Sequence, residues 1–225
     1  MEALDFTAIS HLFTTKRKIF ITSHANPDGD AVGSALALYH FMVAAGHDVN
    51  VMVPNGFPDF LAWLPGKDKV LIYEDSKQEC DRLFSTSDVL FALDYNSPSR
   101  INDAGVSFTR ATGTKILIDH HIDPDTGSYD HCFSTTNISS TSELVYLFMH
   151  FLNDKLINQA IAENIYVGIM TDTGSFSYNC NYVQTFETVA KLIAKGIDAS
   201  RVSRLVNSNN SESRLRLLGF ALSEK

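Results

Sequence analysis

Residues 18–46 read KIFITSHANPDGDAVGSALALYHFMVAAG, and this stretch decides the fold class. The apolar run at 18–22 predicts a buried strand, and the stretch at 31–46 predicts a long apolar helix. The segment between them contains Pro, Gly and Asp, which predicts the turn that joins the two elements. A buried strand followed by a helix is the repeating unit of parallel sheets whose two faces are covered by helices.

The same pattern continues outward along the chain. Further apolar runs predict strands at 48–53 (DVNVMV), 69–73 (KVLIY), 88–94 (DVLFALD) and 114–119 (TKILID). A polar loop is expected next, followed by helices at 139–152, 158–171, 185–196 and 200–225. The first of these helices begins with the capping-box pair Ser140 and Glu143. We therefore predict an α/β fold, a three-layer domain in which a mainly parallel sheet is flanked by helices.

Length and composition narrow the class of protein. The 225 residues are expected to form one main domain over 1–195, followed by a helical linker over 196–225 that is cut short. No apolar run reaches the roughly 18 residues that span a bilayer, and no signal peptide is recognisable, which predicts a cytoplasmic protein. Three cysteines without a CxxC pair indicate reduced thiols.

The net charge of −8 disfavours binding to long nucleic acids, which normally requires a basic face. This charge is a weak guide to small ligands, because some of the acidic residues are candidate metal ligands. Two bound divalent cations would halve the net charge and would concentrate positive charge where a small anion must bind. A small anionic substrate is therefore compatible with the composition.

Potential metal ligands stand at the ends of four apolar segments. They are His24, Asp28 and Asp30 after the first strand, Asp94 after the run at 88–94, Asp119, His120 and His121 at the end of the run at 114–119, and Asp172 at the end of the helix at 158–171. Because sites in α/β sheets form at the carboxyl ends of the strands, we expect these side chains to converge. Structural alternatives exist for individual residues: Asp30 as a helix cap, Asp94 as a cap or turn residue, and Asp172 as part of a helix end at Gly174. No single structural role explains all four segments, whereas a polynuclear metal site does.

In this order, the four motifs resemble those of the DHH phosphoesterase family, which is named for the Asp-His-His motif found here at 119–121. The resemblance covers roughly residues 15–180 and is greatest to the bacterial oligoribonuclease group, often called nanoRNases. Members of that group degrade very short RNAs, and many also dephosphorylate adenosine 3',5'-bisphosphate. Some relatives cleave cyclic dinucleotides or their linear products. The resemblance therefore implies a hydrolase of phosphate esters.

Full-length family members carry a C-terminal substrate-binding domain with a GGGH-type motif, and this sequence has no such motif. The resemblance therefore implies a DHH catalytic domain with part of the linker toward an absent second domain. Since the second domain would help to position the substrate, the isolated domain is expected to be weakly active.

The resemblance also implies a site for two metal ions. One ion would be held by His24, Asp28 and Asp94, and the other by Asp30, Asp94, His120 and Asp172, with Asp94 as the bridge. Mixed imidazole and carboxylate ligands favour Mn²⁺, with Mg²⁺ or Co²⁺ as substitutes. Two such ions lower the pKa of a shared water and stabilise both the attacking and the leaving oxygen.

Other residues are candidates for contact with the substrate. His121 would face the substrate phosphate, and Asp119 would orient neighbouring groups through hydrogen bonds. Arg100, six residues after Asp94, would make a forked contact to a phosphate, with a solvated loop arginine as the alternative. The hydroxyls and amides of Ser139, Ser140 and Thr141 at a helix start are further candidates for phosphate binding.

We expect a phosphodiesterase that hydrolyses short oligoribonucleotides or linear dinucleotides, with adenosine 3',5'-bisphosphate as a candidate second substrate. The rival enzyme is a manganese-dependent inorganic pyrophosphatase or exopolyphosphatase, and Arg100 favours the nucleotide. A third hypothesis is a non-catalytic module that binds metal and senses a nucleotide. The expected partners are this small substrate and, as a candidate, a second copy of the chain in a homodimer. No membrane partner is expected.

Overall fold

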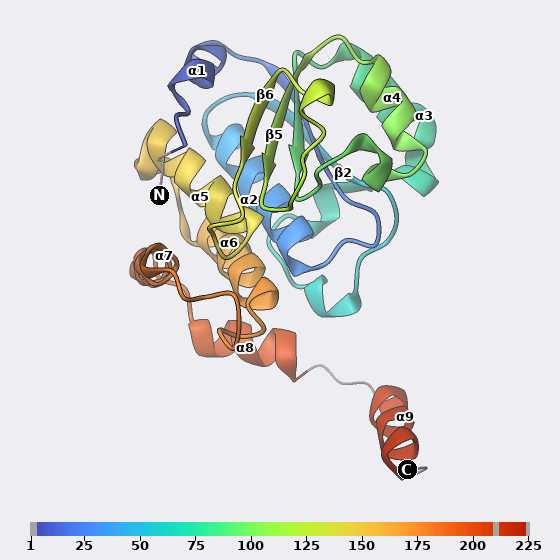
Figure 1. Cartoon of the computed structure of the whole chain (residues 1–225), viewed down its shortest axis with the longest axis vertical. Helices are drawn as coiled ribbons and strands as arrows, with labels where there is room; N and C mark the ends of the chain where they lie inside the picture. Colours follow the sequence, from blue (N-terminus) through green and yellow to red (C-terminus); the bar gives the residue numbers. More distant parts are fainter. Residues whose placement is uncertain (1–3, 209–211, 224–225) are drawn as a thin grey trace.

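The computed structural model describes residues 4–208 and 212–223. Within them, six strands form one fully parallel sheet in the order β3-β2-β1-β4-β5-β6 (Figure 1). The strands are β1 (Lys18–Ser23), β2 (Asp48–Val53), β3 (Val70–Ile72), β4 (Val89–Leu93), β5 (Thr114–Asp119) and β6 (His131–Ser134). The predicted α/β class and parallel sheet are confirmed. β6 lies in the segment that was expected to be a polar loop.

Helices cover both faces of the sheet and form the C-terminal part of the chain. They are α1 (Thr7–Ser10), α2 (Gly29–Ala44), α3 (Tyr73–Thr86), α4 (Ala104–Arg110), α5 (Thr141–Asn153), α6 (Gln159–Asp172), α7 (Val183–Ala194), α8 (Ala199–Asn207) and α9 (Glu212–Ser223). The sequence patterns predicted α2, α5, α6 and α7, and the helical stretch expected at 200–225 contains α9 and nearly all of α8. The patterns missed α1, α3 and α4. A 3₁₀ turn, η4 (Pro98–Ile101), follows β4.

Successive side chains of a strand point to opposite faces of the sheet, and they contribute to two hydrophobic cores, one on each face. In β1, Ile19 and Ile21 pack toward α2, α5 and α6, whereas Phe20 packs toward α3 and α4. All three side chains are buried. The strand has to be apolar on both faces because helices cover both, as Figure 1 shows.

The C-terminal helices differ in how they pack. α8 buries Val202, and its Arg201 forms an ion pair with Glu163 of α6 at 3.3 Å. α9 lies apart from the rest in Figure 1, and its Leu217 and Phe220 side chains are exposed. The expected boundary at residue 195 and the linker that follows stay predictions, and residues 1–3, 209–211 and 224–225 of those segments lie outside the described residues. In the part of the chain that the structure describes, no helix combines the length and hydrophobicity needed to cross a bilayer.

Candidate metal centre

Three adjacent strands end at the site. β1, β4 and β5 are neighbours in the sheet, and their carboxyl ends carry His24, Asp94 and the Asp119-His120-His121 segment. Because the carboxyl ends of parallel strands lie on one side of the sheet, neighbouring strand ends bring together residues that are far apart in the chain, such as His24 and Asp94, which are 70 positions apart. Asp94 has a left-handed backbone with φ of 64°, which is uncommon for a residue other than glycine. The sharp turn that this conformation gives follows directly after β4.

The first half of the site joins the ends of β1 and β4. His24 Nε2 lies 3.3 Å from Asp94 Oδ2 and 3.9 Å from Asp28 Oδ1. Asp28 is also the N-cap of α2, because its Oδ1 accepts hydrogen bonds from the amides of Asp30 and Ala31 at 3.0 Å. The cap of this helix is therefore Asp28, whereas the structural alternative from sequence had assigned that role to Asp30.

The second half is centred on His120. Its Nε2 lies 3.5 Å from Asp94 Oδ1, 3.6 Å from Asp172 Oδ2 and 4.0 Å from Asp30 Oδ2. Asp30 comes from the first turn of α2, and Asp172 is the last residue of α6. The two carboxylate oxygens of Asp94 thus face different halves of the site, Oδ2 toward His24 and Oδ1 toward His120.

The donor set suits divalent cations. Two groups of three side chains have ligand atoms within 4.8 Å of one another and share no residue: His24, Asp28 and Asp94, and Asp30, His120 and Asp172. A further group of the same kind contains Asp94, His120 and His121. Imidazole nitrogens together with carboxylate oxygens are ligands for Mn²⁺, Zn²⁺, Fe²⁺ or Co²⁺, whereas Ca²⁺ prefers oxygen alone. The residues that the sequence predicted as metal ligands all lie in this cluster.

The ionisation of these groups indicates an excess of buried negative charge. Burial, together with Asp94 and Asp172, raises the pKa of Asp30 well above its usual value. Burial also raises the pKa of Asp172 to about 6, although the nearby His120 opposes the change. A divalent cation between these carboxylates would favour their ionised forms, since opposite charge lowers a carboxyl pKa.

His24 and Asp94, in contrast, carry opposite charges, and each stabilises the charged form of the other. Burial would lower the pKa of His24, but the hydrogen bond to Asp94 and its negative charge outweigh burial and raise that pKa to about 9. Burial likewise opposes ionisation of Asp94, and His24 reverses the effect, so that the pKa of Asp94 is lowered. A metal ion at this position would have to displace the proton of His24.

The N-terminus of α5 holds Asp30 from behind. The Thr141 amide donates to Asp30 Oδ2 at 2.7 Å and the Ser142 amide donates to Oδ1 at 2.8 Å. The Thr141 hydroxyl donates to Asp94 Oδ1 at 2.9 Å. The free amides of a helix N-terminus here bind a carboxylate of the protein itself, a use that its partial positive charge favours.

The prediction that Ser139, Ser140 and Thr141 bind substrate phosphate stays a prediction, and this arrangement adds no support for it. All three residues are fully buried, with 0% of their surface exposed. The Ser140 hydroxyl accepts from the Glu143 amide at 3.1 Å as the N-cap of α5, which confirms the capping role expected for Ser140. Thr141 donates to Asp30 and Asp94, so its amide and hydroxyl already bind carboxylates of the protein itself.

Asp119 and His121 form a separate pair beside the carboxylates. His121 Nδ1 donates to Asp119 Oδ1 at 2.7 Å, and this bond is the main cause of a raised His121 pKa. Asp119 is fully buried, whereas His121 is partly exposed with 38% of its side chain accessible. An oriented imidazole with one exposed edge is suited to contact an anion.

Arg100 lies on η4 next to the first motif. Its carbonyl accepts from the Ala25 amide at 2.8 Å, so the two loops are connected through the backbone. The side chain is exposed, and its charge acts on His121 by opposing the rise of the His121 pKa. The guanidinium is therefore near enough for its charge to act on the imidazole, and its side chain is exposed to a ligand.

Sequence reasoning missed Ser142 and Gly168. A Cβ at Gly168 of α6 would overlap the Ser142 hydroxyl and would lie 2.7 Å from Asp30 Oδ1, so the absence of a side chain gives Asp30 its place. The available signal was a glycine inside an otherwise apolar helix, which often marks close packing.

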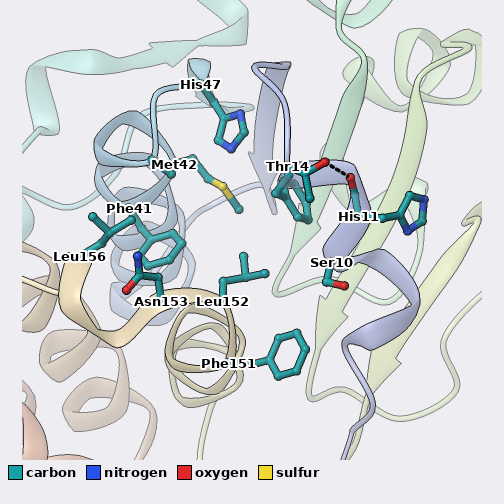
Figure 2. Close-up of a pocket in the computed structure, with 12 residues that line it drawn as sticks. Ser10, His11, Thr14, Phe41, Met42, His47, Phe151, Leu152, Asn153 and Leu156 are labelled. Atoms are coloured by element: carbon teal, nitrogen blue, oxygen red, sulfur yellow. Dashed lines mark hydrogen bonds between the residues drawn. The ribbon is translucent and has the colours of Figure 1, made fainter.

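A mainly apolar hollow of about 590 Å³ lies near the amino ends of the strands, opposite the end that carries the metal-ligand candidates (Figure 2). It is lined in part by Phe41, Met42 and Leu152, with His47 next to the amino end of β2. The six residues of β1 separate this end from His24, roughly 20 Å at about 3.3 Å per residue. This hollow is therefore distinct from the carboxylate cluster.

Known proteins resemble the chain over most of its length. The model of the DHH family, N-terminal domain, matches residues 18–169. The chain is 28% identical to the bifunctional oligoribonuclease and PAP phosphatase NrnA of Thermus thermophilus, over 91% of this chain and 58% of that protein. It is 30% identical to a probable bifunctional oligoribonuclease and PAP phosphatase NrnA of Streptococcus mutans, over 84% of this chain and 56% of that protein.

A solved structure, that of an exopolyphosphatase-related protein from Bacteroides fragilis, is 41% identical and matches with a TM-score of 0.95. The match covers 99% of this chain and 66% of that one. The chain thus spans less than two thirds of the length of each of these three relatives.

Proposed function

Because this chain belongs to the DHH family of phosphoesterases, we propose that it is a two-metal hydrolase of short oligoribonucleotides or linear dinucleotides. The observation that carries this proposal is the arrangement around Asp94, whose two oxygens face different groups of imidazole and carboxylate ligands. A carboxylate in this position is suited to bridge two ions. The relatives that are named oligoribonucleases support the choice of substrate.

In this proposal each half of the site holds one ion. His24, Asp28 and Asp94 would hold the first, and Asp30, Asp94, His120 and Asp172 would hold the second. When bound, two divalent ions supply an activated water near neutral pH and stabilise the charge on the reacting phosphate oxygens. Mn²⁺ is our proposed ion, with Mg²⁺ or Co²⁺ as substitutes, because the ligands mix nitrogen with oxygen.

The remaining residues of the site would bind and orient the substrate. His121, fixed by Asp119 through Nδ1, would present its other ring nitrogen to a phosphate oxygen. Arg100 would donate a forked pair of hydrogen bonds to the same or the adjacent phosphate. Both groups would stabilise negative charge that the phosphate carries into the transition state.

A second candidate function is hydrolysis of pyrophosphate or polyphosphate. It is favoured by the resemblance to the exopolyphosphatase-related protein, at 41% identity. The names of the two oligoribonucleases favour the nucleotide, and so does the exposed Arg100 beside His121. Since the chain spans less than two thirds of these relatives, we treat turnover by residues 1–225 alone, adenosine 3',5'-bisphosphate as a second substrate and a homodimer as proposals.

The first test is the number of Mn²⁺ ions bound at equilibrium, counted by calorimetry or by the electron paramagnetic resonance signal of free Mn²⁺. We expect two ions per chain for the parent protein and fewer for Asp94→Asn. Asp59→Asn, at an exposed aspartate on the 3₁₀ turn Asp59–Leu61, is the matched control and should bind two. A parent protein that binds no Mn²⁺, Mg²⁺ or Co²⁺ would contradict the proposal.

The second test separates the candidate substrates. The Mn²⁺-loaded protein would be incubated with equal concentrations of linear diadenylate and pyrophosphate, with mononucleotide release followed by chromatography and phosphate release followed by a colorimetric assay. Cleavage of the dinucleotide in preference to pyrophosphate supports the leading function, and the reverse preference supports the second candidate. If two ions bind, the dinucleotide binds tightly and neither substrate is cleaved, the chain is a nucleotide-sensing module.

A further inference from the structure

A buried glutamate that is not one of the proposed metal ligands holds the start of α5 in place through hydrogen bonds. Glu143 is fully buried, and its Oε2 accepts three hydrogen bonds. Two come from Ser139, from the amide at 3.3 Å and from the hydroxyl at 2.6 Å, and the third comes from the Thr185 hydroxyl of α7 at 2.7 Å. This carboxylate therefore connects the segment before α5 to α7.

The other carboxylate oxygen, Oε1, is buried and makes no hydrogen bond to the described residues. No lysine or arginine forms an ion pair with Glu143 among residues 4–208 and 212–223. Burying a carboxylate without a cation and with one oxygen unpaired costs free energy that an apolar residue would not cost. Costs of this kind are concentrated where function requires them, so Glu143 needs an explanation beyond packing.

What Glu143 fixes is the peptide that holds Asp30. Ser139 directly precedes the N-cap of α5. The two residues after the N-cap, Thr141 and Ser142, donate their amides to the two oxygens of Asp30. The same segment is held from a second side, because Asn179 donates from its Nδ2 to the Ser139 carbonyl at 3.1 Å. Any shift of this segment therefore moves the hydrogen-bond donors of Asp30.

These hydrogen bonds act mainly on the half of the site that contains His120. The Thr141 hydroxyl donates to Asp94 Oδ1, the oxygen that faces His120, and both amides donate to Asp30, which also lies beside His120. Within residues 4–208 and 212–223, neither His24 nor Asp28 forms a hydrogen bond or ion pair with Glu143 or with the residues that it binds. His24 contacts Asp94 through Oδ2, the oxygen that Thr141 does not bind.

We propose that Glu143 is a positioning residue for the second ion: through Ser139 and the first turn of α5 it fixes Asp30 and Asp94 Oδ1 for the Asp30, His120 and Asp172 group. This inference rests on the proposed two-metal function and deepens it. Its distinctive consequence is selectivity, since loss of Glu143 should weaken one of the two metal-binding steps much more than the other.

The test is a Mn²⁺ titration of the full chain in which the two steps are first assigned with Asp28→Asn and Asp172→Asn. Glu143→Ala should weaken the step that Asp172→Asn affects by roughly 10-fold or more, the size typical for residues that orient metal ligands. Glu143→Gln keeps an acceptor in the place of Oε2 and should restore that affinity to within roughly 3-fold. Thr185→Val, which removes one donor, should weaken the same step to a smaller extent.

Met149→Ala serves as the control for lost stability, because Met149 is fully buried on the same helix and contacts the main core. It should lower the melting temperature and leave both metal affinities unchanged. Glu143→Ala with two unaltered steps, or with both steps weakened equally, would overturn the positioning role while leaving the two-metal function intact. A parent protein without metal binding would instead overturn the proposed function and this inference together.

Discussion

The glycine at position 168 tests the site at a residue that carries no ligand. Gly168 lies inside α6, where the helix passes Asp30 of α2 and Ser142 of α5. A Cβ built at this position overlaps the Ser142 hydroxyl, and it lies 2.6 Å from Ser142 Cβ and 2.7 Å from Asp30 Oδ1. Gly168→Ala therefore pushes directly on a proposed metal ligand and on the residue whose amide holds that ligand.

The expected magnitude follows from two opposing contributions. Alanine in a helix interior is favoured over glycine by about 1 kcal/mol, whereas an extra methyl group in a filled core costs about 1–3 kcal/mol. The net loss of stability is thus about 0–2 kcal/mol, or a melting temperature lower by up to roughly 8 °C for a chain of this length. To relieve the contact, Asp30 Oδ1 must move by at least about 0.3 Å, which approaches the roughly 0.5 Å tolerance of a preorganised site.

We therefore expect Gly168→Ala to weaken the metal-binding step of the Asp30, His120 and Asp172 group by roughly 10-fold, about 1.4 kcal/mol. Calorimetric Mn²⁺ titration measures this loss, and thermal unfolding followed by circular dichroism measures the change in stability. Gly219→Ala is the matched control, since Gly219 also lies in a helix and a Cβ there meets nothing within 4 Å. Unchanged Mn²⁺ affinity in Gly168→Ala would refute the reasoning that this glycine gives Asp30 its place.

Three further predictions concern other parts of the molecule. The metal-free protein should lose stability as the pH rises from about 6.5 to about 9, because the folded-state pKa of His24 is raised to about 9 and Asp94 stabilises the protonated form of His24. Thermal unfolding in EDTA measures this loss of stability, and saturating Mn²⁺ should remove it. Arg100→Ala should raise KM for a dinucleotide roughly 10-fold with a smaller change in kcat, and Arg100→Lys should recover only part of it. Asn158→Ala should cost about 1 kcal/mol in urea unfolding with no change in Mn²⁺ affinity, because Asn158 caps α6 through the Ile161 amide at 3.0 Å.

The sequence could predict the fold and the meeting of the strand ends for one physical reason. Strands covered on both faces are apolar throughout, so β1, β4 and β5 stand out as uninterrupted runs, and a polar residue at the end of such a run is easily noticed. Parallel strands point the same way, which brings His24 and Asp94 to one edge without knowledge of the strand order. The register of the ladder then sets Ser23 beside Leu93, one residue before each of them.

Short or long-range features could not be predicted in the same way. β6 has four residues, HCFS, with one buried side chain, and this is too short and too polar to give a strand pattern. The capping pair Ser140 and Glu143 correctly marked the start of α5. The prediction, however, paired the polar groups at this helix start with a substrate phosphate and not with a residue of the protein. The first turn of α5 binds Asp30, 111 positions away from Thr141, and a local pattern contains no information about such a partner.

The α5 N-terminus also explains why the site should need cations to be stable. A helix N-terminus carries about half a positive charge, and here the amides of its first turn donate to Asp30. Burial, together with Asp94 and Asp172, raises the pKa of Asp30 in spite of this contact, so the partial charge does not offset burial and the neighbouring carboxylates. Divalent ions would supply the missing positive charge, and their binding would add to the free energy of unfolding in proportion to the logarithm of their concentration above the dissociation constant. Metal binding and folding of the β1, β4 and β5 edge should therefore be thermodynamically linked.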